Sequence, residues 1–138
     1  MEESGNYPLN MKIEHLAIWV DDLEKMKDWY CQSFNLTVGD KYVNSIKGFS
    51  FYFLSFSSGT RIELMKRADV SESANPRGMI SGLAHFAISV DSKDNVIEMT
   101  ESLRSKGITI IGEPRTTGDG YFESVIEDPE GNWIEITV

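Results

Sequence analysis

The sequence predicts an α+β fold made of two tandem βαβββ modules, and an internal duplication is the main observation behind this prediction. His85 lies 70 residues after His15, and Glu135 lies 72 residues after Glu63. Each copy begins with an apolar strand-like run followed by a helical stripe, and each ends in two alternating runs around a Gly-containing turn. A chain of 138 residues suits one domain, or two small halves that share one core. The expected parts are, in order, a tail (1–10) and a single domain (11–138) composed of module one (about 11–66), a linker (67–81) and module two (about 82–138).

The first module opens with a β-branched-rich run over about 13–20 that ends at Asp21. Asp is a common helix N-cap, and Asp21 with Glu24 has the spacing of a capping box. A hairpin then joins 49–56 to 61–65 across a Ser-Ser-Gly-Thr turn. The predicted helix between these strands places four apolar residues on one stripe: Leu23, Met26, Tyr30 and Phe34.

The second module repeats this plan. Its first strand is expected over about 83–90 and ends at Asp91, and its helix stops near Gly107. A hairpin joins 121–127 to 132–138 across an Asp-Pro-Glu-Gly turn. The predicted helical stripe consists of Val96, Met99 and Leu103.

Strand alternation assigns the side chains to faces. In four strands the aliphatic residues share one face, which we expect to pack on the helix of the module. The opposite face of each strand carries one polar residue, and these are His15, Glu63, His85 and Glu135. That face also carries Trp19, Met65 and Trp133, so it is not an ordinary solvated surface, and a mixed apolar and polar face is typical of a ligand pocket.

The chain contains only two histidines, and the duplication places them at equivalent positions. Imidazole and carboxylate together suit zinc, nickel, cobalt, manganese or iron. Each glutamate alone has a simpler interpretation, because Glu is common on exposed strand faces. As a set of four the residues favour a metal site, since burying two carboxylates close together is costly without a cation.

The amino-acid composition limits the classes of partner and the cell compartment that we expect. The formal net charge of −9 disfavours nucleic acid. No stretch approaches the roughly 20 apolar residues of a membrane span, and the N-terminus lacks a signal-peptide pattern, so we expect a cytoplasmic protein with no membrane partner. The only cysteine, Cys31, excludes an internal disulfide and is expected to be a small, partly buried residue of the first helix.

Four segments resemble the vicinal oxygen chelate superfamily, the fold of glyoxalases and bleomycin-resistance proteins: HLAIWVDDLEKMKDWY, RIELM, AHFAISVD and EDPEGNWIEI. The resemblance covers about 11–138 and implies paired βαβββ modules whose curled mixed sheets form a metal-containing cleft. It implies one divalent ion per site (nickel, cobalt or zinc, with manganese or iron as further options) and a homodimer, with the site formed within one chain or between two. The implied metal ligands are His15, Glu63, His85 and Glu135.

The kind of ligand separates the members of this superfamily. Extradiol dioxygenases and fosfomycin-resistance transferases of this fold use His, His and Glu as metal ligands, and methylmalonyl epimerases use a set like His-Gln-His-Glu. The His-Glu-His-Glu set of this sequence resembles that of lactoylglutathione lyase. The resemblance therefore implies a lyase or isomerase acting on a small substrate with vicinal oxygens. The metal would lower the pKa of the adjacent C–H and stabilise an enediolate. Glu135 would be the catalytic base, with Glu63 as its counterpart.

The sequence departs from glutathione-dependent members at three places. Trp19 stands where they commonly carry Arg, Arg67-Ala68-Asp69 replaces an Asn-Trp-Gly-like stretch, and Ser81 stands where some carry another Arg. Another thiol adduct or α-oxygenated substrate therefore remains open. So do another metal-dependent activity of this fold, such as an epimerase or a thiol transferase, and a binding protein of the resistance type. Candidate substrate contacts are Trp19, Phe53, Arg67 and Trp133, and Phe51 is a further aromatic residue that could line the pocket. Lys66, Arg77 and Arg115 are further cations for an anionic substrate. The simpler interpretation is that the cations are solvated surface charges and that the aromatic residues belong to the core.

Overall fold

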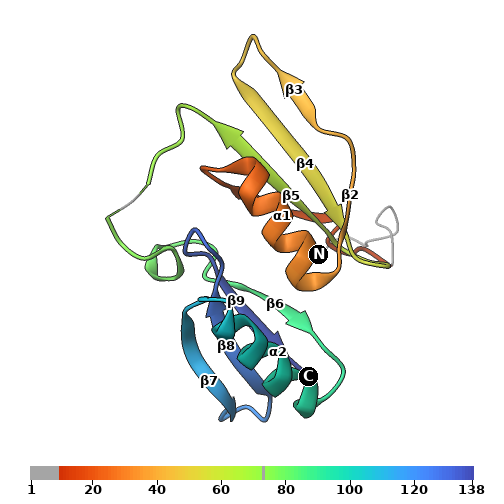
Figure 1. Ribbon diagram of the computed structural model, residues 1–138, viewed down its shortest axis with the longest axis vertical. Coiled ribbons are helices and arrows are strands. Elements are labelled where there is room, and N and C mark those ends of the chain that lie inside the picture. The colour runs from red at the N-terminus through yellow and green to blue at the C-terminus, as the bar shows by residue number, and fades with distance from the viewer. Residues whose placement is uncertain (1–9, 73) are drawn as a thin grey trace, which may run out of the picture. The chain divides into compact units, whose positions relative to one another are not determined.

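The computed structural model describes residues 10–72 and 74–138, and the chain divides into two compact units, Met1–Ala68 and Asp69–Val138. Each unit is a mixed β-sheet with one long α-helix, so the predicted α+β fold is confirmed (Figure 1). The predicted tail over 1–10 lies outside the described residues except for Asn10.

The sheet of unit one has five strands in the order β1-β5-β4-β2, with β3 also paired to β4. Strands β1 and β5 are parallel, because α1 forms the crossover between the first strand and the rest of the sheet, and the other pairs are antiparallel. The elements are β1 (His15–Trp19), α1 (Leu23–Phe34), β2 (Thr37–Val38), β3 (Tyr42–Asn44), β4 (Phe49–Ser55) and β5 (Arg61–Arg67).

Unit two has the same plan with four strands in the order β6-β9-β8-β7, and only β6 and β9 are parallel. One strand, β7, stands where unit one has the two short strands β2 and β3. The elements are the 3₁₀ turn η1 (Arg77–Met79), β6 (Phe86–Ser89), α2 (Lys93–Ser105), β7 (Ile110–Thr116), β8 (Phe122–Glu127) and β9 (Trp133–Thr137).

The helix of unit one confirms the predicted stripe, since Leu23, Met26, Tyr30 and Phe34 are its buried residues. Its predicted N-cap is wrong by one residue. Asp22, not Asp21, accepts the hydrogen bond of the Lys25 amide at 3.0 Å. Glu24 does not complete a capping box, because its carboxylate accepts a hydrogen bond from the Tyr52 hydroxyl and pairs with Lys41.

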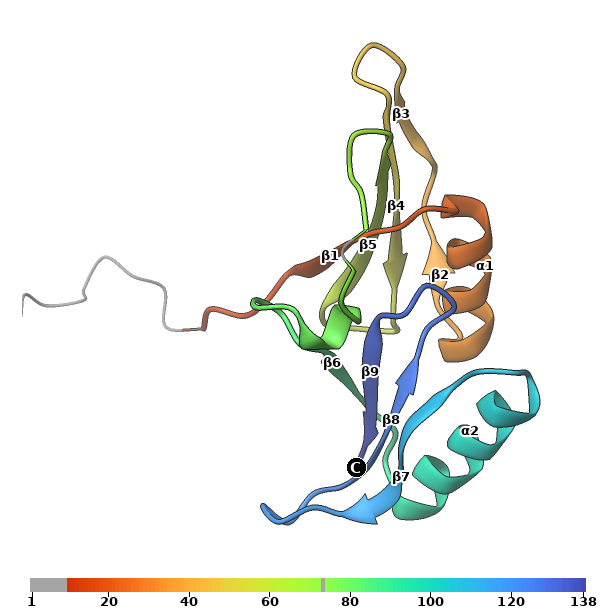
Figure 2. The ribbon, with the colours of Figure 1, turned by 90° about the vertical axis from the view of Figure 1, so that its left-hand side faces the viewer.

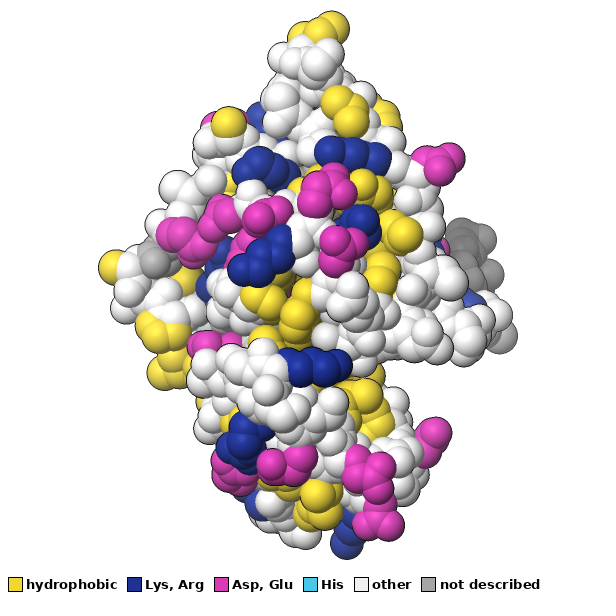
Figure 3. Space-filling model, in the orientation of Figure 1, with side chains coloured by type: hydrophobic (Ala, Val, Ile, Leu, Met, Phe, Trp, Pro, Cys, Tyr) yellow, Lys and Arg dark blue, Asp and Glu magenta, His cyan; other side chains and the backbone are white. Residues whose placement is uncertain are grey.

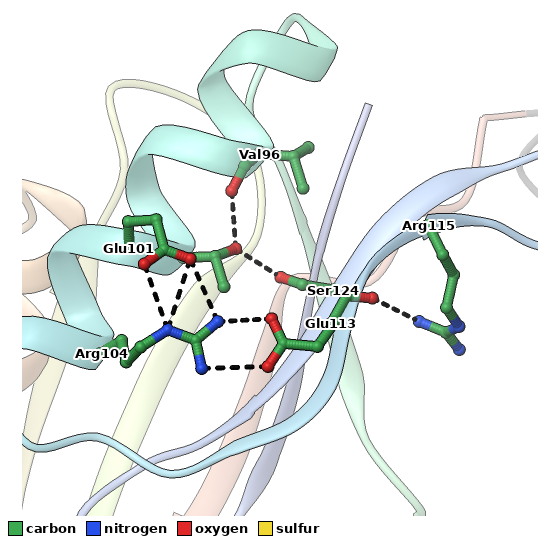
Figure 4. A network of polar contacts seen from close by, with 7 residues as sticks. Val96, Glu101, Arg104, Glu113, Arg115 and Ser124 are labelled. Atoms are coloured by element: carbon green, nitrogen blue, oxygen red, sulfur yellow. Dashed lines mark hydrogen bonds and ion pairs between the residues drawn. The ribbon is translucent and has the colours of Figure 1, made fainter.

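The helix of unit two also differs from its prediction at the cap and on the stripe. Ser92 caps it instead of Asp91. Thr100 is fully buried, whereas Met99 is only half-buried. The Thr100 hydroxyl donates to the Val96 carbonyl and lies 2.7 Å from the hydroxyl of Ser124 on β8, so hydrogen bonds satisfy a polar residue in the core (Figure 4).

A second polar contact joins α2 to its sheet at the surface. Arg104 on α2 binds Glu101 one turn earlier and Glu113 on β7 (Figure 4). This pairing holds the pKa of Glu113 below its ordinary value. On the side drawn in Figure 3, acidic and basic side chains are interspersed in this way and do not form a field of one sign.

Strand alternation places the buried side chains as predicted. Ile62 and Leu64 on β5, and Ile134 and Ile136 on β9, are at most 2% exposed and face the helix of their own unit. Figure 2 shows that each helix covers one side of its sheet only. The opposite face of each sheet, called here the ligand face, therefore carries the residues in between.

Both first strands are shorter than predicted. Strand β1 begins at His15, opposite Arg61, although the pairing of the two segments continues before it: the Arg61 amide donates to the Glu14 carbonyl at 2.9 Å, and the Thr60 hydroxyl donates to the Ile13 carbonyl at 2.8 Å. Strand β6 begins only at Phe86. No helix within the described residues is long and apolar enough to cross a membrane.

Candidate metal-binding faces

In unit one the ligand face brings together His15 and Glu63. Strand β1 pairs in parallel with β5 so that Ala17 lies opposite Glu63, and His15 is the next residue along on the same face. The His15 Nε2 atom lies 3.5 Å from Glu63 Oε1. Glu63 is the more buried of the two side chains, at 12% exposure against 40% for His15.

The other nitrogen of His15 is also held. Its Nδ1 atom lies 2.8 Å from the Glu14 carboxylate. Arg61 binds the same carboxylate through Nε at 3.0 Å and Nη2 at 2.7 Å. The hydrogen bonds from Arg61 and, next, from His15 lower the pKa of Glu14 to about 2. An ionised Glu14 at Nδ1 favours the tautomer that leaves Nε2 as an acceptor, which is how a carboxylate orients a metal-binding histidine.

In unit two the ligand face brings together His85 and Glu135. Ala87 lies opposite Glu135 in the parallel pair β6–β9, which repeats the Ala17–Glu63 relation of unit one. His85 directly precedes β6, and its Nε2 atom lies 2.9 Å from Glu135 Oε2. The duplication seen in the sequence thus reproduces the same imidazole–carboxylate pair in both sheets.

The separations within these pairs suit two ligands of one metal ion. With metal–ligand bonds of about 2.1 Å, two ligand atoms are roughly 3.0 Å apart at a 90° angle and roughly 3.4 Å apart at a tetrahedral angle. The observed separations of 2.9 and 3.5 Å lie close to these two values. Across residues 10–72 and 74–138, no group of three or more His, Cys, Asp or Glu side chains is placed to hold a metal ion. Each unit therefore supplies one His–Glu pair.

A further carboxylate, which sequence analysis missed, lies on the ligand face of unit two. Glu123 on β8 is 8% exposed and is hydrogen-bonded to Glu135. Its burial, followed by the charge of Glu135 and this hydrogen bond, raises the pKa of Glu123. Alternation along β8 could have shown the face of Glu123, but only the cross-strand register places it diagonally beside Glu135.

The predicted substrate contacts divide between the two units. Trp19, Phe53 and Arg67 occupy ligand-face positions of unit one, and Trp133 occupies one in unit two. The Phe53 ring stands edge-on to the His15 ring, with 5.2 Å between the ring centroids. The Arg61 guanidinium lies over the Phe53 ring, 3.9 Å from its centroid. The Trp133 ring is half-buried, and a side chain at Gly78 would collide with it.

The other predicted cations lie elsewhere. Lys66 donates to the backbone carbonyl of Asp21, and Arg77 pairs with Glu72 in the segment around η1. Arg115 donates at 3.4 Å to the backbone carbonyl of Glu123, so it lies beside that residue rather than at Glu135 itself.

Comparison with known proteins agrees with this arrangement. A sequence model of the Glyoxalase/Bleomycin resistance protein/Dioxygenase superfamily matches residues 12–136. The chain is 31% identical over 130 residues to biphenyl-2,3-diol 1,2-dioxygenase 2 of Rhodococcus globerulus, covering 92% of this chain and 62% of the relative. The chain thus spans less than two thirds of that protein.

Solved structures give the same family. Glyoxalase I from Zea mays superposes with a TM-score of 0.74 at 25% identity, over 91% of this chain and 44% of the maize protein. A glyoxylase/bleomycin resistance protein/dioxygenase domain from Frankia sp. EAN1pec superposes with a TM-score of 0.79 at 17% identity, over 94% and 98% of the two chains, and shows the fold. The chain belongs to the glyoxalase/bleomycin resistance protein/dioxygenase superfamily.

Proposed function

We propose that this protein is a metal-dependent lyase or isomerase of the glyoxalase type, in which the two His–Glu pairs bind one divalent ion. The observation that supports this most is the repetition of one imidazole–carboxylate pair on equivalent strands, with ligand separations of 3.5 and 2.9 Å. Two carboxylates and two neutral imidazoles balance the charge of a divalent ion. Nickel, cobalt or zinc are expected first, and manganese or iron also accept this ligand set.

His15, Glu63, His85 and Glu135 would hold the divalent ion, which would act as a Lewis acid and make a substrate C–H beside a carbonyl more acidic. Glu135 would take this proton and return it to the neighbouring carbon, with Glu63 as its counterpart. A carboxylate is a suitable base here because it can take up a proton at one substrate carbon and return the same proton to the next. Glu14 holds the His15 ring through Nδ1, which keeps Nε2 directed at the ligand face.

The carboxylate at position 63 distinguishes this proposal from extradiol cleavage, although one relative is a biphenyl-diol dioxygenase. The dioxygenases of this fold use His, His and Glu as metal ligands and lack a carboxylate at this position, whereas Glu63 here lies 3.5 Å from His15. Trp19 stands where glutathione-dependent members commonly carry Arg, so we propose a thiol adduct or α-oxygenated substrate other than the glutathione adduct.

We expect the protein to act as a homodimer. Sedimentation velocity of the purified protein tests this expectation.

The first experiment measures bound metal and turnover on the purified full chain. We expect about one divalent ion per site by mass spectrometry of the metals. We also expect isomerisation of methylglyoxal hemithioacetals prepared with several thiols. Absence of stoichiometric metal would overturn the proposal. If the protein binds metal but turns over no hemithioacetal, the glyoxalase reaction is wrong, and the metal site would serve another reaction of this fold, such as epimerisation, thiol transfer or catechol cleavage.

The second experiment tests the base. Glu135→Gln keeps an oxygen ligand but cannot accept the proton, so kcat should fall by about 10²–10⁴-fold while bound metal is retained. Glu98→Gln removes the same charge from the exposed side of α2 and serves as the matched control, with unchanged kcat. Full activity in Glu135→Gln would show that another group is the base.

A further inference from the structure

We propose that the substrate carries an aromatic group and that this group lies on the aromatic part of the ligand face of unit one. This inference rests on the proposed metal site and names the substrate class that the site takes. The surface in question, called here the aromatic face, consists of Trp19, Tyr42, Phe49, Phe51 and Phe53.

The register of the sheet places these rings beside the predicted metal ligands. Phe53 lies directly opposite Glu63 in the β4–β5 pair, and Phe51 and Phe49 follow at every second position of β4. Tyr42 lies opposite Phe51 in the β3–β4 pair. Because residues opposite each other and two apart share a face, all of these rings are on the face that carries Glu63.

The rings contact each other without a break, starting from a metal ligand. His15 contacts Phe53 edge-on at 5.2 Å, and Phe53 contacts Phe51 at 5.4 Å. Phe51 stacks on Tyr42 at 4.8 Å with an interplanar angle of 23°. Phe49 lies 5.6 Å from Phe51 and 6.2 Å from Trp19. A substrate held at His15 and Glu63 would therefore meet aromatic rings as it extends along β4.

The aromatic face is not the core of unit one. The core lies on the other side of the sheet, where α1 covers Leu54, Ile62 and Leu64. By contrast, Trp19 is 39% exposed and Tyr42 is 44% exposed. Large aromatic residues gathered on an exposed face are more typical of a binding site than of an ordinary surface.

The cation beside His15 is already engaged by other groups. Arg61 binds the Glu14 carboxylate and stacks on Phe53, so it supports an aromatic surface here rather than an anion site. The ligand face of unit two differs, since Glu123 lies beside Glu135 there. The duplicated units therefore share the His–Glu pair but not its surroundings, and the rings belong to unit one.

Two hydroxamates test this inference by binding alone. Benzohydroxamate and acetohydroxamate chelate a metal through the same two vicinal oxygens and differ only in a phenyl or a methyl group. Titration calorimetry on the zinc- or nickel-loaded protein should show roughly tenfold or more tighter binding of benzohydroxamate, because ring stacking and apolar burial add to chelation. Phe51→Leu should reduce this ratio to less than about threefold, since one ring at the centre of the face is lost.

The controls separate the two proposals. Trp29→Leu removes a half-buried ring from α1, outside the aromatic face, and should leave the ratio unchanged. Acetohydroxamate should bind Phe51→Leu and wild type about equally, because it carries no ring to stack on Phe51, and among the ring pairs of the described residues His15 contacts Phe53 and not Phe51. Equal affinity of wild type for both hydroxamates would overturn the aromatic substrate and leave the metal site standing. Binding of neither compound would overturn the metal site and this inference with it.

Discussion

The contact between Gly78 and Trp133 gives a sharp prediction about unit two. The η1 turn lies against the indole ring, and a Cβ atom added at Gly78 would meet Trp133 Cδ2 at 2.1 Å. Ordinary contact between carbon atoms needs about 3.5–4.0 Å, so Gly78→Ala forces a shift of roughly 1.5 Å in the turn or the ring. Overpacking of this kind costs about 1–3 kcal/mol.

Chemical denaturation of the purified Gly78→Ala variant measures this cost directly as a change in the free energy of unfolding. For a chain of this size the same loss corresponds to a fall in Tm of about 3–15 °C. Gly118→Ala is the matched control, since nothing lies within 4 Å of its added Cβ and its backbone is in an ordinary conformation. We expect Gly118→Ala to be neutral or slightly stabilising, because alanine restricts the unfolded chain.

The comparison between these two variants decides the matter. If Gly78→Ala and Gly118→Ala unfold at the same denaturant concentration, the η1 turn does not press on Trp133, and the reasoning is refuted. The prediction also bears on the site, because Trp133 is two residues from Glu135 and on the same face of β9. A shift of the indole ring should therefore weaken metal binding in Gly78→Ala but not in Gly118→Ala.

Two further predictions concern the attachment of α2 to its sheet. Thr100→Val keeps the shape but leaves the buried Ser124 hydroxyl without its partner, so unfolding experiments should show a loss of about 1–3 kcal/mol, and adding Ser124→Ala should recover part of it. The second variant, Arg104→Ala, tests the pH dependence of stability. Because Arg104 lowers the pKa of Glu113 in the folded protein, the pair stabilises the fold at pH values above about 4.5, the pKa of Glu113 in the unfolded chain. This stability is lost as the pH falls through the lower pKa of the folded state. Wild type should therefore lose more Tm than Arg104→Ala between pH 6 and pH 2; parallel curves would contradict this.

Local periodicity explains why much of the fold could be predicted from the sequence. The stripe of Leu23, Met26, Tyr30 and Phe34 is buried as predicted, because a helix face is fixed by spacing alone. Alternation likewise assigned Ile134 and Ile136 to the buried face of β9. The duplication then indicated which polar residues are equivalent, although it does not show that all four bind one ion.

Sequence motifs were less reliable where pairing between distant segments decides the outcome. The Val20 amide still donates to the Met65 carbonyl, and the Val90 amide to the Thr137 carbonyl, so each strand pairing continues to the residue before the aspartate. One more residue is needed to turn the chain, and this moves the caps to Asp22 and Ser92.

The α+β class, the duplicated plan and the face of each His and Glu could be predicted from the sequence alone, because they follow from spacing along one strand or helix. Which side chains meet depends on the tertiary structure. The buried Thr100 hydroxyl finds its partner in the hydroxyl of Ser124, 24 residues away, and Glu123 contacts Glu135 because β8 and β9 pair in one register. Such contacts depend on cross-strand distances that no local pattern encodes.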